Sequence, residues 1–334
     1  MKHALFNPPL VTAVAVLLAV TTTFTGGTAQ ASPLSNTDAF LRASFTNGQF
    51  IAGFTPGKPD FGFSLEALLQ RKVLGEPADT LEPAVKYLLT STAQTGTVSN
   101  PNGFLFNGGK LRLGLAGKWA FVSSILKAGN GNTRRQIISA ALSKVDGSGD
   151  VAPDAGANTY DRAWLILGLA ANDRARQAVT LATNLASHQL ADGGFNDGFT
   201  LGSSSSDGTG ITLQALAAAR GLATQSQRRT LNASIDKAVA YLNKAKEGDH
   251  FTSYGDYDMN GTAYAAMGLK SIGAQVGSIQ NWIKSKLASD GGLQTPWSGG
   301  AGDIYATAQG ATALLGQSYA GLLPNAGQSQ GGTR

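Results

Sequence analysis

The chain has 334 residues, a formal net charge of +5 at pH 7 and no cysteine. The missing cysteine excludes disulfide bonds, thiolate metal sites and cysteine nucleophiles. Only 14% of the residues are charged, and lysine and arginine are scattered along the chain, so a basic groove for nucleic acid is not expected.

Residues 1–31 have the pattern of a secretory signal peptide. A basic start at Lys2 precedes an apolar run from Leu10 to Val20, and the segment closes on Ala29-Gln30-Ala31. This run is too short to cross a bilayer core, which needs about twenty apolar residues. We therefore expect cleavage after Ala31, a secreted, extracellular mature protein, and no membrane span in the mature form.

Residues 32–324 contain about six degenerate repeats. A small residue recurs once in each copy, and a leucine follows it six positions later. The small residues are Gly62, Ala120, Ala163, Gly210, Ala263 and Ala308, and the leucines are Leu68, Leu126, Leu169, Leu216, Leu269 and Leu314. Successive small residues are 43 to 58 positions apart, which leaves room for two helices and a loop in each repeat.

Each repeat is predicted to contain an amphipathic outer helix, a glycine-rich turn, an irregular loop and a nearly apolar inner helix. Ile235, Ala238 and Leu242 share one face of an outer helix, and Asp192-Gly193-Gly194 is one of the turns. A helix that is apolar almost all round has to be covered on most sides. The sequence therefore predicts a single all-α domain over 32–324, with an outer ring of helices around an inner ring, and a disordered tail over 325–334.

Two kinds of motif in these repeats resemble the prenyltransferase and squalene-cyclase repeat. They are the Asp-Gly-Gly turns within Gln189 to Phe195 and Asp290 to Leu293, and the inner-helix openings Gly208-Thr209-Gly210 and Gly261-Thr262-Ala263. The resemblance implies an α/α toroid of the terpenoid-cyclase type. The segment from Ala306 to Tyr319 is most similar to the cobalamin-carrier branch, the helical domain of transcobalamin and intrinsic factor, and to its secreted bacterial relatives. A shared fold does not by itself imply a shared activity.

The enzymes of this superfamily need residues that the chain lacks. Prenyltransferases hold zinc with Asp, Cys and His, and the macroglobulin thioester needs Cys, so neither chemistry is expected. Squalene-type cyclases make a strong acid with an Asp-x-Asp-Asp sequence. The corresponding residues here are Asp258-Met259-Asn260-Gly261, with an amide at the central position, while Asp207 keeps the central acid without acidic neighbours. A degenerate terpene cyclase remains an alternative.

Asp256 to Gly261 also matches the first half of a calcium-binding loop. The twelfth position is Met267 in place of the bidentate glutamate, so an EF-hand is excluded. A looser calcium site remains an alternative. Capping of a helix start is the interpretation that we adopt for Asp207, Asp258 and Asn260, and for Asp161 and Asp303 at the corresponding starts of other inner helices. No metal and no cofactor are assigned.

The starts of the inner helices and the loops before them are predicted to share one face, because all six inner helices begin at the same end of a toroid. Aromatic rings beside polar groups on this face suit a sugar or a flat cofactor, and they suit equally well an anchoring of the loops. The ligand-binding residues predicted there are Asp161, Asp207, Tyr254, Tyr257, Asp258, Trp297, Asp303 and Tyr305.

We expect a non-catalytic toroid that binds a ligand or partner on this face, at the cell envelope. The ligand or partner would be a small molecule, a glycan or an envelope protein. The alternative is an enzyme, either a carbohydrate-active hydrolase or lyase or the terpene cyclase mentioned above. In a carbohydrate-active enzyme, Asp207 with Asp258 or Asp161 would provide a carboxylate pair, and Tyr257 or His250 a base.

Overall fold

The computed structural model describes residues 33–55, 57–198 and 202–324 of the chain. All of them belong to one compact unit, which consists mainly of helices. The predicted signal peptide over 1–31, its cleavage site and the predicted tail over 325–334 lie outside the described residues. None of the helices in the described part is long and apolar enough to cross a membrane.

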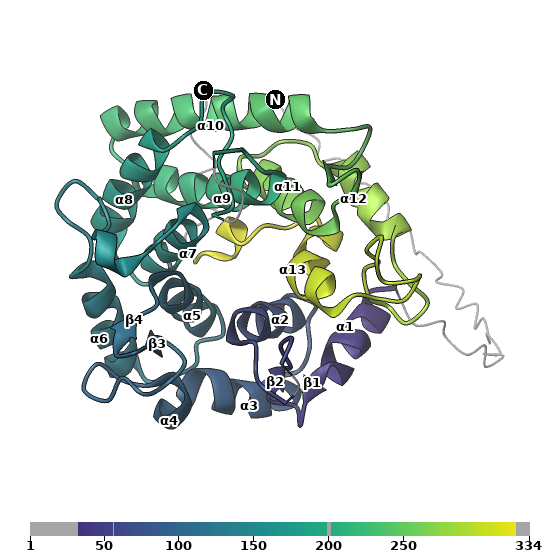
Figure 1. Ribbon diagram of the computed structural model, residues 1–334, viewed down its shortest axis with the longest axis horizontal. Coiled ribbons are helices and arrows are strands. Elements are labelled where there is room, and N and C mark those ends of the chain that lie inside the picture. The colour runs from purple at the N-terminus through teal and green to yellow at the C-terminus, as the bar shows by residue number, and fades with distance from the viewer. Residues whose placement is uncertain (1–32, 56, 199–201, 325–334) are drawn as a thin grey trace, which may run out of the picture. The chain divides into compact units, whose positions relative to one another are not determined.

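An inner ring of helices forms the core of the fold (Figure 1). Each inner helix packs against the next one along the chain, and the last packs against the first, so the ring is closed. The inner helices are α2 (Phe61–Val73), α5 (Leu113–Ile125), α7 (Thr159–Ala170), α9 (Ser206–Leu222), α11 (Met259–Ser271) and α13 (Ile304–Leu314).

An outer ring covers the inner one. Its helices are α1 (Pro33–Ala43), α3 (Ala78–Val85), continued by the π-helix η1 (Lys86–Thr90) and by α4 (Thr92–Thr95), and α6 (Gly131–Leu142), α8 (Ala175–Ser187), α10 (Gln225–Ala245) and α12 (Gly277–Ser285). Helix α1 packs against both α13 and α2, and so covers the seam between the last and first inner helices. This architecture confirms the predicted all-α fold of the α/α toroid type.

Small residues let the inner helices approach closely. A β-carbon on Gly210 of α9 would lie only 2.3 Å from the carbonyl carbon of Tyr264 in α11, and one on Gly117 of α5 would lie 2.5 Å from the α-carbon of Leu165 in α7. No side chain larger than hydrogen fits at such a contact without a backbone shift. The recurring glycine or alanine is therefore a packing requirement of the inner ring.

The helix caps correct the predicted register of the first two repeats. In the last four repeats the small residue stands five positions after the N-cap, as Ala263 does after Asp258. The N-cap of α5 is Arg112, so Gly117 holds this position and Ala120 does not. The predicted register is wrong by one helical turn, because suitable residues recur every three or four positions in a helix that is apolar all round.

A hydroxyl group four positions after the cap ties the preceding loop to the inner helix in four repeats. The hydroxyl accepts a hydrogen bond from a loop N–H, with the pairs Thr209–Phe195 (2.9 Å), Thr262–Phe251 (3.0 Å), Thr307–Leu293 (2.8 Å) and Ser64–Ile51 (2.9 Å). Since α2 is capped by Asp60, its small-residue position is held by Leu65 and not by Gly62. The threonines of the inner-helix openings thus have a structural role.

Short β-hairpins shape three of the loops that lead into inner helices. They pair β1 (Phe45–Thr46) with β2 (Phe50–Ile51), β3 (Phe106–Asn107) with β4 (Lys110–Leu111), and β5 (Thr252–Ser253) with β6 (Asp256–Tyr257), all antiparallel. Two 3-10 turns, η2 (Pro153–Ala155) and η3 (Ala320–Leu322), complete the described elements. The hairpins precede α2, α5 and α11 and hold their connecting loops at the helix starts.

The segment after α13 returns to the middle of the ring (Figure 1). Its Tyr319 is fully buried and its ring contacts the rings of Phe121, Trp164 and Tyr264. The phenol of Tyr319 accepts a hydrogen bond of 2.9 Å from the side-chain amide of Gln70. This segment therefore fills the interior of the ring with an aromatic side chain from outside the repeats.

Candidate functional site

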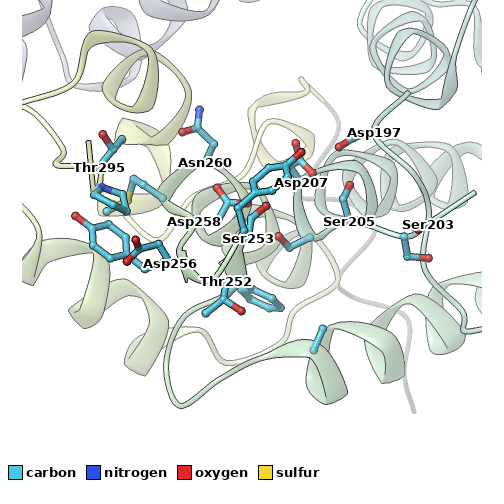
Figure 2. A pocket seen from close by; sticks show the side chains of 18 of the residues that line it. Asp197, Ser203, Ser205, Asp207, Thr252, Ser253, Asp256, Asp258, Asn260 and Thr295 are labelled. Carbon is cyan, nitrogen blue, oxygen red and sulfur yellow. The ribbon is translucent and has the colours of Figure 1, made fainter. Parts of the chain in front are cut away.

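A cleft of about 460 Å³ opens where α9 and α11 begin. Three segments line it: residues 203–207, the β5–β6 hairpin with the first residues of α11, and Thr295 to Trp297 in the loop before α13 (Figure 2). Asp197, Tyr241 and Ala245 complete the lining. Clefts of this size commonly hold small ligands or parts of larger ones.

Neighbouring inner helices run in the same direction at this face. A β-carbon on Gly261, in the first turn of α11, would touch the hydroxyl of Ser206, the first residue of α9. Likewise, a β-carbon on Gly114 in the first turn of α5 would touch Asp161 in the first turn of α7. The helix N-termini and their loops therefore meet at one face, as the repeat pattern predicts.

Two aromatic side chains stand exposed at the rim of the cleft. Tyr254 is 91% exposed and Trp297 is 77% exposed. Tyr254 lies at the tip of the β5–β6 hairpin with a φ of 54°, a left-handed conformation that is uncommon for a bulky residue. The ring of Tyr254 thus stands in solvent at the tip of the hairpin.

Two partly buried carboxyl groups, Asp207 and Asp258, lie in the middle of the cleft, with Asp197 and Asp256 on either side (Figure 2). Burial raises the pKa of Asp258 to about 6, and the nearby charge of Asp207 contributes to this rise. Burial also raises the pKa of Asp207, with a further contribution from Asp197. Asp258 is therefore partly protonated close to neutral pH, and the charge of Asp207 favours its protonated form.

The two acids are held differently by the backbone. Asp258 is the N-cap of α11, where its Oδ1 accepts a hydrogen bond of 2.9 Å from the N–H of Gly261. Asp207, predicted as a cap, is instead the second residue of α9, and Ser205 is the N-cap. The Oδ1 of Asp207 accepts a hydrogen bond of 2.8 Å from the N–H of Gly208. Both carboxylates are thereby oriented by backbone N–H groups.

The charge of the cleft is entirely acidic over its described lining. Asp197, Asp207, Asp256 and Asp258 are its ionisable acids, and no lysine or arginine is among the described lining residues. A ligand that carries carboxylates would be repelled at neutral pH. This charge favours a neutral or cationic ligand.

The remaining predicted ligand-binding residues lie outside the described lining of the cleft. Asp161 forms a capping box with Asn158 at the start of α7, and Asp303 caps α13 by accepting from the N–H of Ala306 at 2.8 Å. The phenol of Tyr305 donates to the carbonyl oxygen of Ala52 at 3.3 Å. The cleft therefore brings together Asp207, Tyr254, Tyr257, Asp258 and Trp297 of the predicted set.

The side chains predicted as bases for a lyase serve as anchors. The ring of His250 stacks on that of Trp282, with centroids 4.6 Å apart, and His250 lies outside the described lining of the cleft. Tyr257 lines the cleft, but its ring is packed against Trp282 and lies under the ammonium group of Lys286. Burial and the charge of Asp256 raise the pKa of Tyr257, which makes this phenol a weak base candidate at neutral pH.

The segment from Asp256 to Gly261 forms β6 and the first turn of α11 instead of a loop that could surround an ion. Among the described residues there is no group of three or more His, Cys, Asp or Glu side chains arranged to hold a metal. The half-match to a calcium loop thus falls on a strand and the start of a capped helix.

A buried polar network in the interior of the ring escapes prediction from the sequence. Glu66 of α2 is fully buried, and its Oε1 accepts from the phenol of Tyr264 at 2.6 Å and lies 3.1 Å from the ammonium group of Lys118. The phenols of Tyr160 and Tyr264 are hydrogen-bonded to each other. Burial and the charge of Glu66 raise the pKa of both phenols well above the usual value, so both stay protonated.

This network is connected to the cleft. Asn260 lines the cleft, and its side-chain amide donates to the side-chain oxygen of Gln309 in α13. The amide of Gln309 in turn donates to the phenols of Tyr160 and Tyr264, at 3.4 Å each. Hydrogen bonds therefore run without interruption from the cleft to the buried carboxylate of Glu66.

The signal that could have revealed the network is a column in the repeats. Glu66, Lys118, Tyr264 and Gln309 each stand six positions after the cap of their helix, directly after the small-residue position. Polar side chains in helices that are otherwise apolar need partners. The register predicted for α2 and α5 was wrong by one turn. In that register, Glu66 and Lys118 do not stand in the same column of the repeats as Tyr264 and Gln309.

Comparison with known proteins supports the fold and leaves the activity open. No family model matches the chain, and no curated protein matches it. The fold is similar to the solved structure of a variant of UGL, an unsaturated glucuronyl hydrolase, with the saccharide dGlcA-Glc-Rha-Glc. The TM-score is 0.56 and the identity 13%, over 85% of this chain and 94% of the other. At this identity, the similarity assigns the chain to the α/α toroid fold.

Proposed function

We propose that the protein is a carbohydrate-active hydrolase whose substrate binds in the cleft at the start of α9 and α11. The observation that carries this proposal is the pair of partly buried carboxyl groups, Asp207 and Asp258, which line one cleft and whose pKa values are both raised. Paired carboxyl groups with different environments are what cleavage of a glycosidic bond requires. The proposal favours the enzymatic alternative over the non-catalytic module expected from the sequence.

The lining of the cleft suits a sugar. The exposed rings of Trp297 and Tyr254 can lie against the apolar face of a pyranose, while the hydroxyl groups of Ser203, Ser204 and Thr252 offer hydrogen bonds to its polar edge. A fold of the same type holds a saccharide in the UGL structure. Both considerations support a glycan over an isoprenoid, whose apolar surface offers no hydrogen bonds to the carboxyl and hydroxyl groups of the lining.

Asp258 would act as the general acid. With its pKa near 6, Asp258 stays partly protonated at neutral pH and can give its proton to the glycosidic oxygen as the bond to the anomeric carbon breaks. Asp207, as a carboxylate, would assist the attack of water on that carbon. The negative charge of Asp207 also keeps the proton on Asp258 before reaction.

The experiment is release of reducing ends from a panel of polysaccharides by the mature chain, compared among Asp207→Asn, Asp258→Asn and Asp303→Asn. The last variant is a matched control, because Asp303 caps α13 as Asp258 caps α11 but lies outside the described lining of the cleft. We expect the first two variants to lose at least about a hundredfold in rate, and Asp303→Asn to keep it.

Two outcomes would count against the proposal. Full activity in both Asp207→Asn and Asp258→Asn would mean that cleavage occurs elsewhere. Glycan binding that depends on Trp297 without any cleavage would replace the hydrolase with the non-catalytic binding module.

A further inference from the structure

The exposed aromatic side chains follow three successive loops around the ring. Tyr254 precedes α11, Trp297 precedes α13, and Phe54, which is 87% exposed, precedes α2. In the closed ring α13 lies between α11 and α2, so these are neighbouring loops. Among the described residues, the other exposed large apolar side chain is Val98, which lies in the loop before α5. Solvent-exposed aromatic rings thus gather on one arc of the face that carries the cleft.

Phe54 is the outer member of a stack of three aromatic rings. Its ring lies 5.1 Å from that of Tyr305, and the ring of Tyr305 lies 4.5 Å from that of Phe63. The inner two rings are fixed, because Phe63 belongs to α2 and the phenol of Tyr305 donates to the carbonyl oxygen of Ala52. A ring held in place from below presents its free face without further loss of conformational entropy on binding.

The stack lies one loop further around the ring than the exposed rings of the cleft. Tyr305 is in the first turn of α13, directly after the loop that carries Trp297 into the cleft. The hydrogen bond from Tyr305 to Ala52 joins this turn to the loop of Phe54. The stack of Phe54, Tyr305 and Phe63 therefore stands where the loop next to that of Trp297 meets the start of α13.

We propose that this aromatic stack is a second binding subsite, which holds further sugar units of a chain whose cleaved part occupies the cleft. The proposal rests on the proposed function and deepens it, since it makes the substrate a polysaccharide instead of a small saccharide. The position of the stack next to the loop of Trp297 and the surroundings of its rings both favour a sugar chain as the occupant. Phe54 is followed by Thr55, Pro56, Gly57 and Lys58, so its own loop adds no second large apolar side chain to the stack, unlike the broad apolar patch typical of a protein interface.

The test measures affinity as a function of chain length. The catalytically impaired Asp258→Asn variant is titrated calorimetrically with di- to octasaccharides of four neutral series: β-glucan, mannan, xylan and N-acetylglucosamine oligomers. We expect the octasaccharide of the recognised series to bind more tightly than the disaccharide. Phe54→Ala, added to Asp258→Asn, should weaken octasaccharide binding about fivefold and leave disaccharide binding unchanged. Phe54→Trp in the same background should keep the tight octasaccharide binding. Val98→Ala, an exposed apolar change on another loop, is the matched control and should alter neither.

The outcomes separate this inference from the function on which it rests. Binding of short and long chains with equal affinity, or an octasaccharide affinity that Phe54→Ala leaves intact, overturns the second subsite while the hydrolase proposal stands. An absence of binding in all four series, together with no cleavage of any polysaccharide, overturns both.

Discussion

Glu66 and Lys118 form an ion pair inside the ring, with the carboxylate oxygen and the ammonium nitrogen 3.1 Å apart and the side chains 0% and 9% exposed. The ammonium group also lies over the ring of Trp164, 4.8 Å from its centroid. The pair joins α2 to α5, and the phenol of Tyr264 extends it to α11. Charges at such depth are tolerated only where they are paired and hydrogen-bonded.

Lys118→Met should lower the free energy of unfolding by about 3 kcal/mol, because it leaves the buried carboxylate of Glu66 without a counter-charge. Glu66→Gln in the same chain should recover most of this loss, since the amide oxygen still accepts from Tyr264 and no charge is left buried. Urea unfolding of both single variants and the double variant gives the coupling energy. Additive losses would show that the two side chains do not compensate each other.

Gly210→Ala should destabilise the fold by about 1 to 3 kcal/mol, because the added methyl group would meet the backbone of Tyr264 at a contact between α9 and α11. Gly277→Ala is the matched control, since it is also a helical glycine, in α12, and a β-carbon there meets no atom within 4 Å. The control should be neutral or slightly stabilising. Thermal unfolding of both variants checks the prediction, and equal midpoints would mean that the inner ring relaxes around the methyl group.

The architecture could be predicted from the sequence because it follows from local rules. Apolar inner helices, amphipathic outer helices and turns such as Asp192-Gly193-Gly194 all recur with the repeat, and each of them indicates the same two rings. The register of α5 could not be fixed in this way. A cap such as Arg112 carries no sequence signal for a helix start, and its side chain makes no capping hydrogen bond.

The site could be predicted only in part, for a related reason. The repeat places Asp207, Asp258 and the aromatic loops on one face, but it does not say which neighbouring loops converge. Asp303 and Asp258 have the same capping geometry, and the lining of the cleft alone distinguishes them. The ion pair of Glu66 and Lys118 joins the neighbouring helices α2 and α5, and the column that contains both residues becomes visible only in the register that the helix caps give.

Asp258→Asn should raise the melting temperature at pH 7 and leave it unchanged near pH 4. The pKa of Asp258 is raised from 3.8 to about 6 in the folded chain, so the folded state binds this proton more tightly than the unfolded state. The resulting stability is fully present below about pH 4, falls as the pH rises towards 6, and is lost above that. Asparagine resembles the protonated acid and still caps α11. Melting curves between pH 4 and 8 test this, with Asp303→Asn as the capping control. A variant that melts below the wild type at pH 7 would contradict the raised pKa.

The cleft should select among glycans by charge. The affinity of the chain with unaltered Trp297 is measured at neutral pH for three series of oligomers of equal length. They are N-acetylglucosamine oligomers, their deacetylated amino form and uronic acid oligomers. Because the described lining carries Asp197, Asp207, Asp256 and Asp258 without lysine or arginine, we expect the uronic acid oligomers to bind at least about tenfold more weakly than the neutral ones at low salt.

The amino oligomers should bind at least as tightly as the neutral ones. Added salt should reduce the differences in affinity among the three series, since the charges lie in an open cleft. Lowering the pH to 5 should also reduce these differences in affinity, because Asp258 is then mostly protonated. Asp256→Asn, which removes a charge without touching the proposed acid pair, should narrow the gap between uronic acid and neutral oligomers. Equal affinity for all three series at low salt would mean that the ligand does not contact these carboxylates, and would move the binding site away from the starts of α9 and α11.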